Sequence, residues 1–256
     1  ADDAAPLIEK YIAALPAGGK NPAAGVGPAV SEAIMDRGVR YLGKRVSDTV
    51  YAGVEEKSAV ILAFSGPCVW SEEEDFRLGA LAQALTIRLR EVLREDEGGT
   101  YGVGVSSAME KIPAGQYLFR IVFFCSPDRA EELTALAMKE IEIFTKGPVD
   151  PALVTKVREI IRAGHERNME DNGYILSLLV DRCYLGLPLE KPFEIASMDE
   201  KLEPAVFSEM ARKYLDTGRL LSVTLYPGRL GGAPAGAEAG ADVSGGVPAD
   251  AGTGDR

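Results

Sequence analysis

The sequence predicts an α+β fold in which a β-sheet and a layer of helices form a two-layer sandwich. About five segments have the short apolar pattern of strands, and the helical segments come in runs rather than alternating singly with strands. The 256 residues, 46% hydrophobic and 26% charged, are enough to bury a core of ordinary globular composition.

The charge balance narrows the classes of partner. A formal net charge of −11 leaves no basic patch for binding phosphates, so we expect no nucleic acid among the partners. The acidic balance favours basic or neutral partners instead. No apolar run is long enough to span a bilayer, and no membrane span is expected.

The first third of the chain predicts one helix and two strands. Residues Asp3–Leu15 place apolar side chains on one helical face, and this helix ends at Pro16–Gly19. A connection rich in Gly, Pro and Ala runs to about Gly38. Extended segments follow at Val46–Tyr51 and Ser58–Phe64. The second is almost continuously apolar, which predicts a strand covered on both faces.

The middle of the chain predicts a long helix followed by two strands. Ser71 and Glu74 have the spacing of a capping box, which opens a helix that extends to about Arg94. Strands are expected near Thr100–Ala108 and Gln116–Cys125. One face of the second strand carries only apolar side chains: Tyr117, Phe119, Ile121, Phe123 and Cys125.

The second half of the chain predicts four helices and a closing strand. Ser126–Pro127 and Asp150–Pro151 are both start signals, with a capping residue before a proline at the first helical position. The expected helices run from Pro127 to about Thr145, from Pro151 to about Met169, from Tyr174 to Leu185 and from Pro204 to Leu215, and the strand is Leu220–Tyr226. We expect one domain over residues 1–230. Residues 231–256, rich in Gly and Ala, are expected to form a disordered tail.

Two hydrogen-bond donors flank the turn between the long helix and the next strand. Arg94 offers a planar guanidinium and Tyr101 a hydroxyl, and two convergent donors suit a substrate carbonyl or a developing oxyanion. Plain alternatives stay open, because Arg94 can pair with acidic neighbours at a helix end and Tyr101 can be an ordinary strand aromatic. Gly102 and Gly104, expected on the strand face opposite Tyr101, indicate either a helix packed closely there or room for an extended peptide.

The same segment carries a family resemblance. Leu93-Arg94-Glu95 followed by Gly99-Thr100-Tyr101 resembles the Arg/Tyr signature in the second, non-zinc half of pitrilysin- and insulinase-type zinc metallopeptidases. Three weaker matches occur in the expected order: an amphipathic helix ending in Leu15-Pro16, Gly66-Pro67 after an apolar strand, and Asn172-Gly173-Tyr174 before a leucine-rich helix.

The resemblance implies a fold and a division of labour. The fold would be a sandwich of a mostly antiparallel sheet with helices on one face, as in pitrilysin and processing peptidases, here truncated at its N-terminus. Full enzymes of this type have two facing halves, and one half carries a His-x-x-Glu-His zinc motif. By resemblance, Arg94 and Tyr101 would bind the peptide or protein substrate. Zinc is expected in a partner half, located in the same polypeptide or in another subunit.

This chain by itself lacks the residues for hydrolysis. Its one histidine, His165, cannot supply an inverted zinc motif, and Met169 stands where a His-Glu-x-x-His motif needs its second histidine. We expect His165 to be a solvated or capping residue. The cysteines Cys68, Cys125 and Cys183 form no metal or redox motif and are expected to be buried free thiols. No catalytic residue and no metal ligand are therefore assigned to this chain.

Two alternatives to the peptidase hypothesis stay open. Inactive relatives serve as structural or presenting subunits of processing-peptidase-like assemblies, and Arg94 and Tyr101 would then be relics of the fold. A stand-alone peptide-binding module is the other possibility. The compartment is left open, although resemblance to bacterial relatives that are often exported points to the periplasm.

Overall fold

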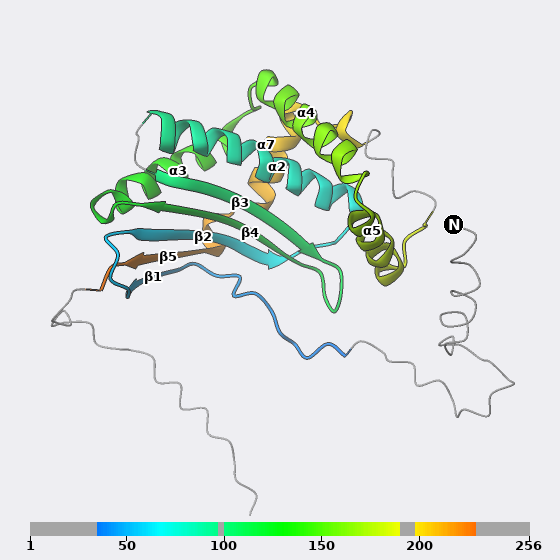
Figure 1. Cartoon of the computed structure of the whole chain (residues 1–256). Helices are drawn as coiled ribbons and strands as arrows, with labels where there is room; N and C mark the ends of the chain where they lie inside the picture. Colours follow the sequence, from blue (N-terminus) through cyan, green and yellow to red (C-terminus); the bar gives the residue numbers. More distant parts are fainter. Residues whose placement is uncertain (1–34, 97–99, 190–197, 229–256) are drawn as a thin grey trace, which may run out of the picture.

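The protein is built around one five-stranded sheet. The computed structural model describes residues 35–96, 100–189 and 198–228, without the side chains of residues 94–96. The strand order is β1-β5-β2-β4-β3, with β1 parallel to β5 and every other pair antiparallel (Figure 1). The strands are β1 Val46–Tyr51, β2 Ser58–Pro67, β3 Thr100–Glu110, β4 Gln116–Cys125 and β5 Leu220–Tyr226.

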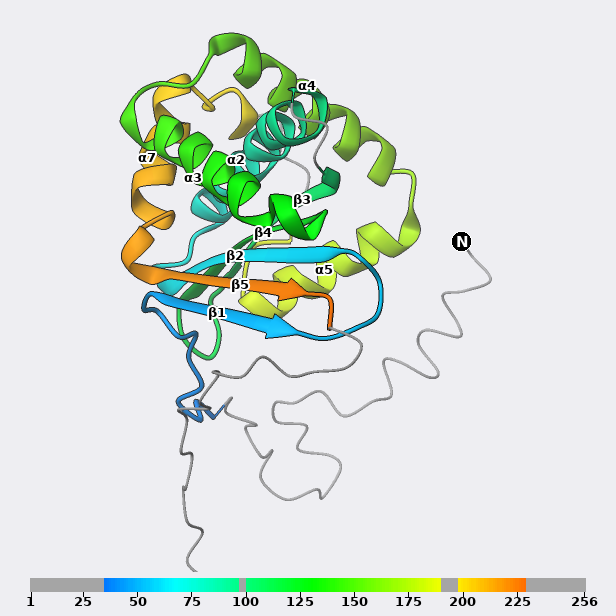
Figure 2. The ribbon, with the colours of Figure 1, turned by 90° about the vertical axis from the view of Figure 1, so that its left-hand side faces the viewer.

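The helices form a second layer on one face of this sheet (Figure 2). They are α2 Glu72–Arg90, which continues as the π-helix Glu91–Asp96, then α3 Ala130–Lys146, α4 Pro151–Asn168, α5 Asn172–Leu185 and α7 Pro204–Tyr214. Within the described ranges no helix covers the opposite face of the sheet. The predicted α+β two-layer sandwich, mostly antiparallel with helices on one face, is confirmed.

The core lies between these two layers. The five inward side chains predicted on β4 are all at most 1% exposed, and the alternation of β4 is therefore confirmed. Opposite them, α2 buries Leu78, Leu81, Leu85 and Leu89 at helical spacing. On β2, Val60, Leu62 and Phe64 are fully buried, whereas Ala59 and Ile61 are half-buried on the helix-free side. The expectation that β2 is covered on both faces is thus wrong for its first half, because no described helix lies there.

The helix α5 begins at Asn172 rather than at the predicted Tyr174, and two details of the other helix starts differ from the prediction. Ser71 accepts a hydrogen bond from the Glu74 N–H, and Asp150 accepts one from the Ala152 N–H, as capping residues do. Ser126 makes no side-chain cap, and the residues after it form a 3₁₀ turn, Pro127–Arg129, before α3 begins. The expected helix Asp3–Leu15 and the tail 231–256 lie outside the described residues.

The second difference concerns Glu74, which joins α2 to α7 instead of closing a capping box. Its carboxylate pairs with Lys213 and accepts a hydrogen bond from the Tyr214 hydroxyl at 2.6 Å. Burial by itself would raise the pKa of the Glu74 carboxyl, but the hydrogen bonds from Lys213 and Tyr214 outweigh it and lower that pKa. Tyr214 in turn packs edge-on against Tyr117 of β4, so this contact ties both helices to the sheet.

We expect Glu74→Gln to destabilise the protein by about 1–3 kcal/mol at neutral pH, because a charged acceptor is lost from two donors. The pKa of Glu74 is lowered in the folded state, so its contribution is present above the ordinary value of 4.5 and is lost as the pH falls through the folded pKa. Urea unfolding of wild type and variant across acidic pH measures this. Glu209→Gln, an exposed change on α7, is the control. If the difference in unfolding free energy between wild type and Glu74→Gln does not depend on pH, this account of Glu74 is contradicted.

Candidate functional site

Arg94 lies where α2 widens into a π-helix. The sequence predicts that the helix extends to about Arg94, and the π-helix Glu91–Asp96 extends it by two residues. Leu93 is fully buried and anchors this turn against the core, and the turn lies next to β3. Single turns of π-helix occur frequently at functional sites. The backbone of Arg94 is therefore placed close to the start of β3, whereas its side chain lies outside the described part.

Tyr101 projects from a β-bulge at the start of β3. Thr100 pairs with Cys125 and Gly102 pairs with Phe124, so Tyr101 has no partner on β4. The Thr100 hydroxyl donates to the Phe124 carbonyl at 2.8 Å, and the Gly102 N–H donates to the Thr100 hydroxyl oxygen at 3.1 Å. These bonds replace the missing ladder bonds and hold the bulge. Tyr101 is left 66% exposed.

The bulge reverses the face on which Tyr101 was expected. Strict alternation puts Tyr101 on the same face as Val103, which points into the core. Instead, the Lys57 ammonium lies 5.3 Å from the centre of the Tyr101 ring and 5.7 Å from that of Phe124, which belongs to the helix-free face. The expectation is wrong because the extra residue of the bulge breaks the two-residue period. Tyr101 accordingly lies with Lys57 and Phe124 on the open face.

Two of these side chains, Lys57 and Phe124, help to line a hollow of about 380 Å³. The loop from β1 to β2 forms most of it, and the Gly53 carbonyl accepts a hydrogen bond from the Gly228 N–H at 2.9 Å, which fastens the loop to the end of β5. Its lining is mostly small or apolar, with Lys57 and Glu55 as the charged groups: Ala52, Gly53, Val54, Glu55, Lys57, Ser58, Ala59, Phe124 and Leu225. Such a hollow suits one apolar side chain of a peptide that passes Tyr101.

The two glycines of β3 face open space. β3 is an edge strand, and a Cβ placed at Gly102 or at Gly104 would meet nothing within 4 Å. No described helix packs there, so the close helix contact that the glycines first suggested is absent from the described part of the chain. Ser106 and Ala108 continue this row of small residues along the open face. The alternative that the sequence left open, room for an extended peptide, agrees with this geometry.

Other candidate groups are not gathered into a site. Among the described residues no cluster of three or more His, Cys, Asp or Glu side chains could hold a metal ion. His165 is half-buried on α4, and its carbonyl accepts the Met169 N–H at the end of that helix. Cys125 is buried as expected, but Cys183 is exposed, so the expectation of buried thiols is wrong there.

Two of the three thiols, those of Cys68 and Cys125, lie in surroundings that disfavour the thiolate. Burial raises the pKa of both the Cys68 and the Cys125 thiol, which makes them poor nucleophiles at neutral pH. In the described ranges no helix combines the length and the apolar character needed to cross a membrane.

Sequence reasoning missed Lys57 and Phe124 as neighbours of Tyr101. Both depend on the bulge, since a regular β3 would turn Tyr101 toward the helices. The residues Thr100-Tyr101-Gly102 carried a partial signal, because glycine inside a strand often marks a bulge.

A curated protein with a similar sequence is described as a probable zinc protease. The chain is similar to the probable zinc protease PqqL of Haemophilus influenzae, with 25% identity over 170 residues, covering 66% of this chain and 18% of that protein. It thus spans less than a fifth of the length of this curated relative.

Similar folds occur in solved structures. A protease from Helicobacter pylori has a TM-score of 0.62 at 17% identity, covering 72% of this chain and 44% of that one. The ferredoxin protease FusC, solved in complex with Arabidopsis ferredoxin, has a TM-score of 0.63 at 18% identity, covering 87% of this chain and 23% of that one. At these identities the likeness concerns the fold alone. The model of the family described as Peptidase M16 inactive domain matches residues 1–161, which confirms the resemblance to pitrilysin-type metallopeptidases, and the chain belongs to this family.

Proposed function

We propose that this chain is the substrate-binding, non-zinc portion of a zinc metalloendopeptidase, in which Arg94 and Tyr101 orient the scissile peptide carbonyl. The observation that carries the proposal is the bulge at Thr100 and Gly102, which turns Tyr101 onto the open face of the sheet. A tyrosine with only a packing role would gain nothing from a conformation that leaves it 66% exposed beside a hollow.

The chemistry of these side chains supports this role. A guanidinium and a phenol both donate hydrogen bonds, and neither takes up a proton from a peptide at neutral pH. Two such donors stabilise an oxyanion that develops on the carbonyl more than they stabilise the uncharged carbonyl. Gly102 and Gly104 leave space for the main chain of the peptide, and the hollow beside Lys57 and Phe124 accommodates one of its side chains.

The metal belongs to another segment or subunit under this proposal. The relative from Haemophilus influenzae is a probable zinc protease, but this chain has one histidine and no described cluster of ligands. The residues present therefore do not fit a zinc ion. The part assigned to this chain is binding and orientation, and its substrate is a peptide or a protein.

A mixing experiment tests this division of labour. Hydrolysis of a quenched fluorescent peptide is measured for the chain alone and for the chain mixed with a zinc-bearing half, each with and without a chelator. We expect chelator-sensitive turnover only in the mixture. Association of the two halves without any turnover would favour the structural-subunit alternative, and peptide binding by the chain alone without any effect on turnover would favour a binding module.

In the active mixture, Arg94→Ala and Tyr101→Phe should each lower kcat by about 10²–10³-fold, the usual effect of losing one oxyanion donor. The melting temperature should stay unchanged, since Tyr101 is exposed. Arg90→Ala, at an exposed position on the last turn of α2, and Tyr51→Phe, at an exposed position on β1, are matched controls. Unchanged kinetics in both test variants would contradict the proposed roles of Arg94 and Tyr101 in substrate binding.

The open face of β3 gives a separate prediction. Gly104→Val should leave stability unchanged or raise it by up to about 1 kcal/mol, because valine favours strands and its Cβ meets nothing. Turnover should nevertheless fall, by about 10²-fold, since an isopropyl group displaces a peptide lying there.

Two controls calibrate that variant. Ser47→Val adds the same side chain at an exposed position on β1, the opposite edge strand, and should leave turnover unchanged. Gly115→Val should unfold the protein, because a Cβ at Gly115 would lie 2.0 Å from the Cys68 carbonyl oxygen. Full activity of Gly104→Val would show that peptide does not pass over this strand.

A further inference from the structure

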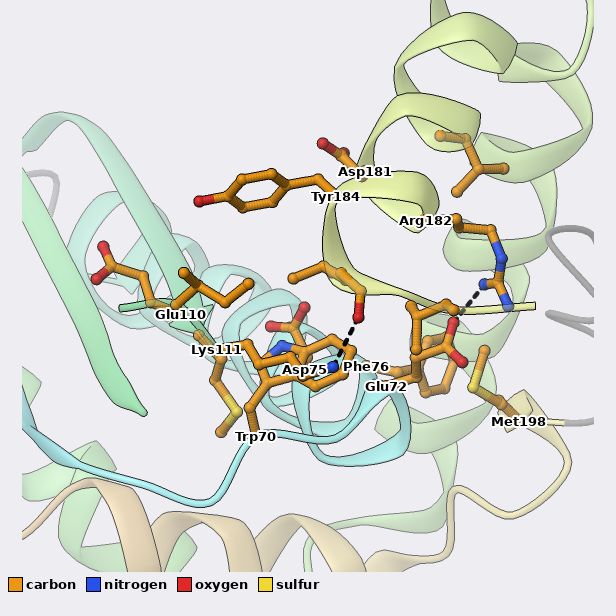
Figure 3. A pocket seen from close by; sticks show the side chains of 15 residues that line it. Trp70, Glu72, Asp75, Phe76, Glu110, Lys111, Asp181, Arg182, Tyr184 and Met198 are labelled. Carbon is orange, nitrogen blue, oxygen red and sulfur yellow. Dashed lines mark hydrogen bonds and ion pairs between the residues drawn. The ribbon is translucent and has the colours of Figure 1, made fainter. Parts of the chain in front are cut away.

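A second, larger cavity of about 520 Å³ lies at the other end of β3 (Figure 3). It is enclosed by the hairpin between β3 and β4, the first turn of α2 and the C-terminal half of α5. Met109, at this end of β3, is eight residues from Tyr101, which places the two about 25 Å apart along the strand. The cavity is therefore distinct from the hollow beside Tyr101.

The walls of the cavity are mainly apolar. The apolar residues of the lining are Trp70, Phe76, Met109, Ile112, Leu178, Leu185, Leu187 and Met198. Trp70 is the single tryptophan of the whole chain. A cavity of this size with a few polar groups is typical of a ligand site.

Both cations of the lining are already engaged. The Arg182 side chain is 5% exposed, and its guanidinium donates to Glu72 Oε1 at 2.5 Å and to the Pro188 carbonyl at 2.7 Å. The Lys111 ammonium donates to the Leu185 carbonyl at 2.7 Å and lies 5.3 Å from the centre of the Trp70 ring. An anionic ligand would find neither cation free.

The carboxylates outnumber these cations. The lining contains Glu72, Asp75, Glu110 and Asp181. Glu72 pairs with Arg182, and Glu110 accepts a hydrogen bond from the Tyr41 hydroxyl at 2.9 Å. Asp181 makes no hydrogen bond or ion pair within the described ranges, and Figure 3 shows it beside Tyr184 on the α5 side of the cavity. The lining thus has two more carboxylates than cations.

Asp75 is another carboxylate of the cavity lining. Burial raises the pKa of its carboxyl, and the hydrogen bond from the Met109 N–H offsets this only in part. A bound cation would relieve the unfavourable burial of the ionised form. A bare metal ion is a poor candidate, since no cluster of three metal-ligating side chains occurs among the described residues. The remaining match is an organic cation with an apolar body.

We propose that this cavity binds a short peptide segment in which an arginine or lysine adjoins a large apolar residue. The cationic group would lie between Asp75 and Asp181, and the apolar side chain would pack against Trp70, Phe76 and Leu178. The net charge of −11 favours the approach of basic ligands. Binding here requires neither Arg94 nor Tyr101, so this inference and the proposed function can fail separately.

Trp70 provides a direct measurement, because all tryptophan emission of the full chain comes from this wall of the cavity. The probe is acetyl-Phe-Arg-Leu-amide, titrated while emission is recorded, with isothermal titration calorimetry on the same samples. Acetyl-Phe-citrulline-Leu-amide keeps the shape of arginine without its charge, and acetyl-Ser-Arg-Ser-amide keeps the charge without the apolar neighbours. We expect saturable binding of the first peptide. The affinity for each of the other two peptides should be lower by about tenfold or more.

Variants locate the site. Asp75→Asn should weaken binding of the arginine peptide about tenfold or more, and Asp181→Asn, at an exposed position, by about two- to fivefold. Neither should change the affinity for the citrulline peptide. Asp128→Asn, at an exposed position before α3, is a control that should bind like wild type. Far-ultraviolet circular dichroism verifies that each variant is folded.

Three results would overturn the proposal. The first is that the arginine peptide produces no heat and no change in emission. The second is equal affinity for the arginine and citrulline peptides. The third is full affinity in both aspartate variants. Loss of hydrolysis in the mixing experiment would leave these titrations unaffected.

Discussion

The inward side chains of β4 pack against α2 and the other helices of the layer, and the remaining features depend on this contact. Phe119, Ile121 and Phe123 are fully buried there. β4 is paired with β2 on one side and β3 on the other, so its alternation dictates which side chains of both neighbours face the helices. The pairing register of β4 is strongly constrained, because a shift of one residue would turn its apolar side chains out of the core. Among the described elements, no helix covers the other face of the sheet.

Two regions escape this constraint, and both lie at an end of β3. At its start, the hydroxyl of Thr100 takes over ladder bonds and Tyr101 leaves the regular alternation. At its far end, the hairpin faces both the first turn of α2 and the C-terminal half of α5. Packing against the helices determines which residues occur in the middle of β3. The two ends of the strand are less constrained by packing and can carry side chains with a functional role.

The electrostatic character of the two ends is opposite. Near Tyr101 the ammonium of Lys57 lies over two aromatic rings, those of Tyr101 and Phe124, in cation–π contacts. At the far end carboxylates outnumber cations, and Asp75 and Asp181 are among them. α5 is poorly buried for so apolar a helix, with Arg182 as its one buried residue. This helix is held to α2 mainly through the ion pair with Glu72 and to the hairpin through Lys111.

Much of this architecture could be predicted from local sequence. The apolar alternation in Gln116–Cys125 and the proline after Asp150 are signals within a few residues, and the strand and helix that they predicted are confirmed. The Arg/Tyr segment similarly pointed to the family that the comparisons show. Its role in substrate binding is still a prediction.

Tertiary structure decided the features that depend on distant partners. Glu74 had the spacing of a capping box, but Lys213 and Tyr214, far along the chain, compete for its carboxylate with stronger, partly buried hydrogen bonds. Tyr101 was expected on the strand face of Val103, and the pairing of Thr100 and Gly102 with β4 placed it on the other face. The amino-acid pattern by itself determined which segments form helices and strands, because that preference is set by neighbouring residues. Which side chains meet was decided by strand pairing and helix packing, because those contacts join residues that the sequence keeps far apart.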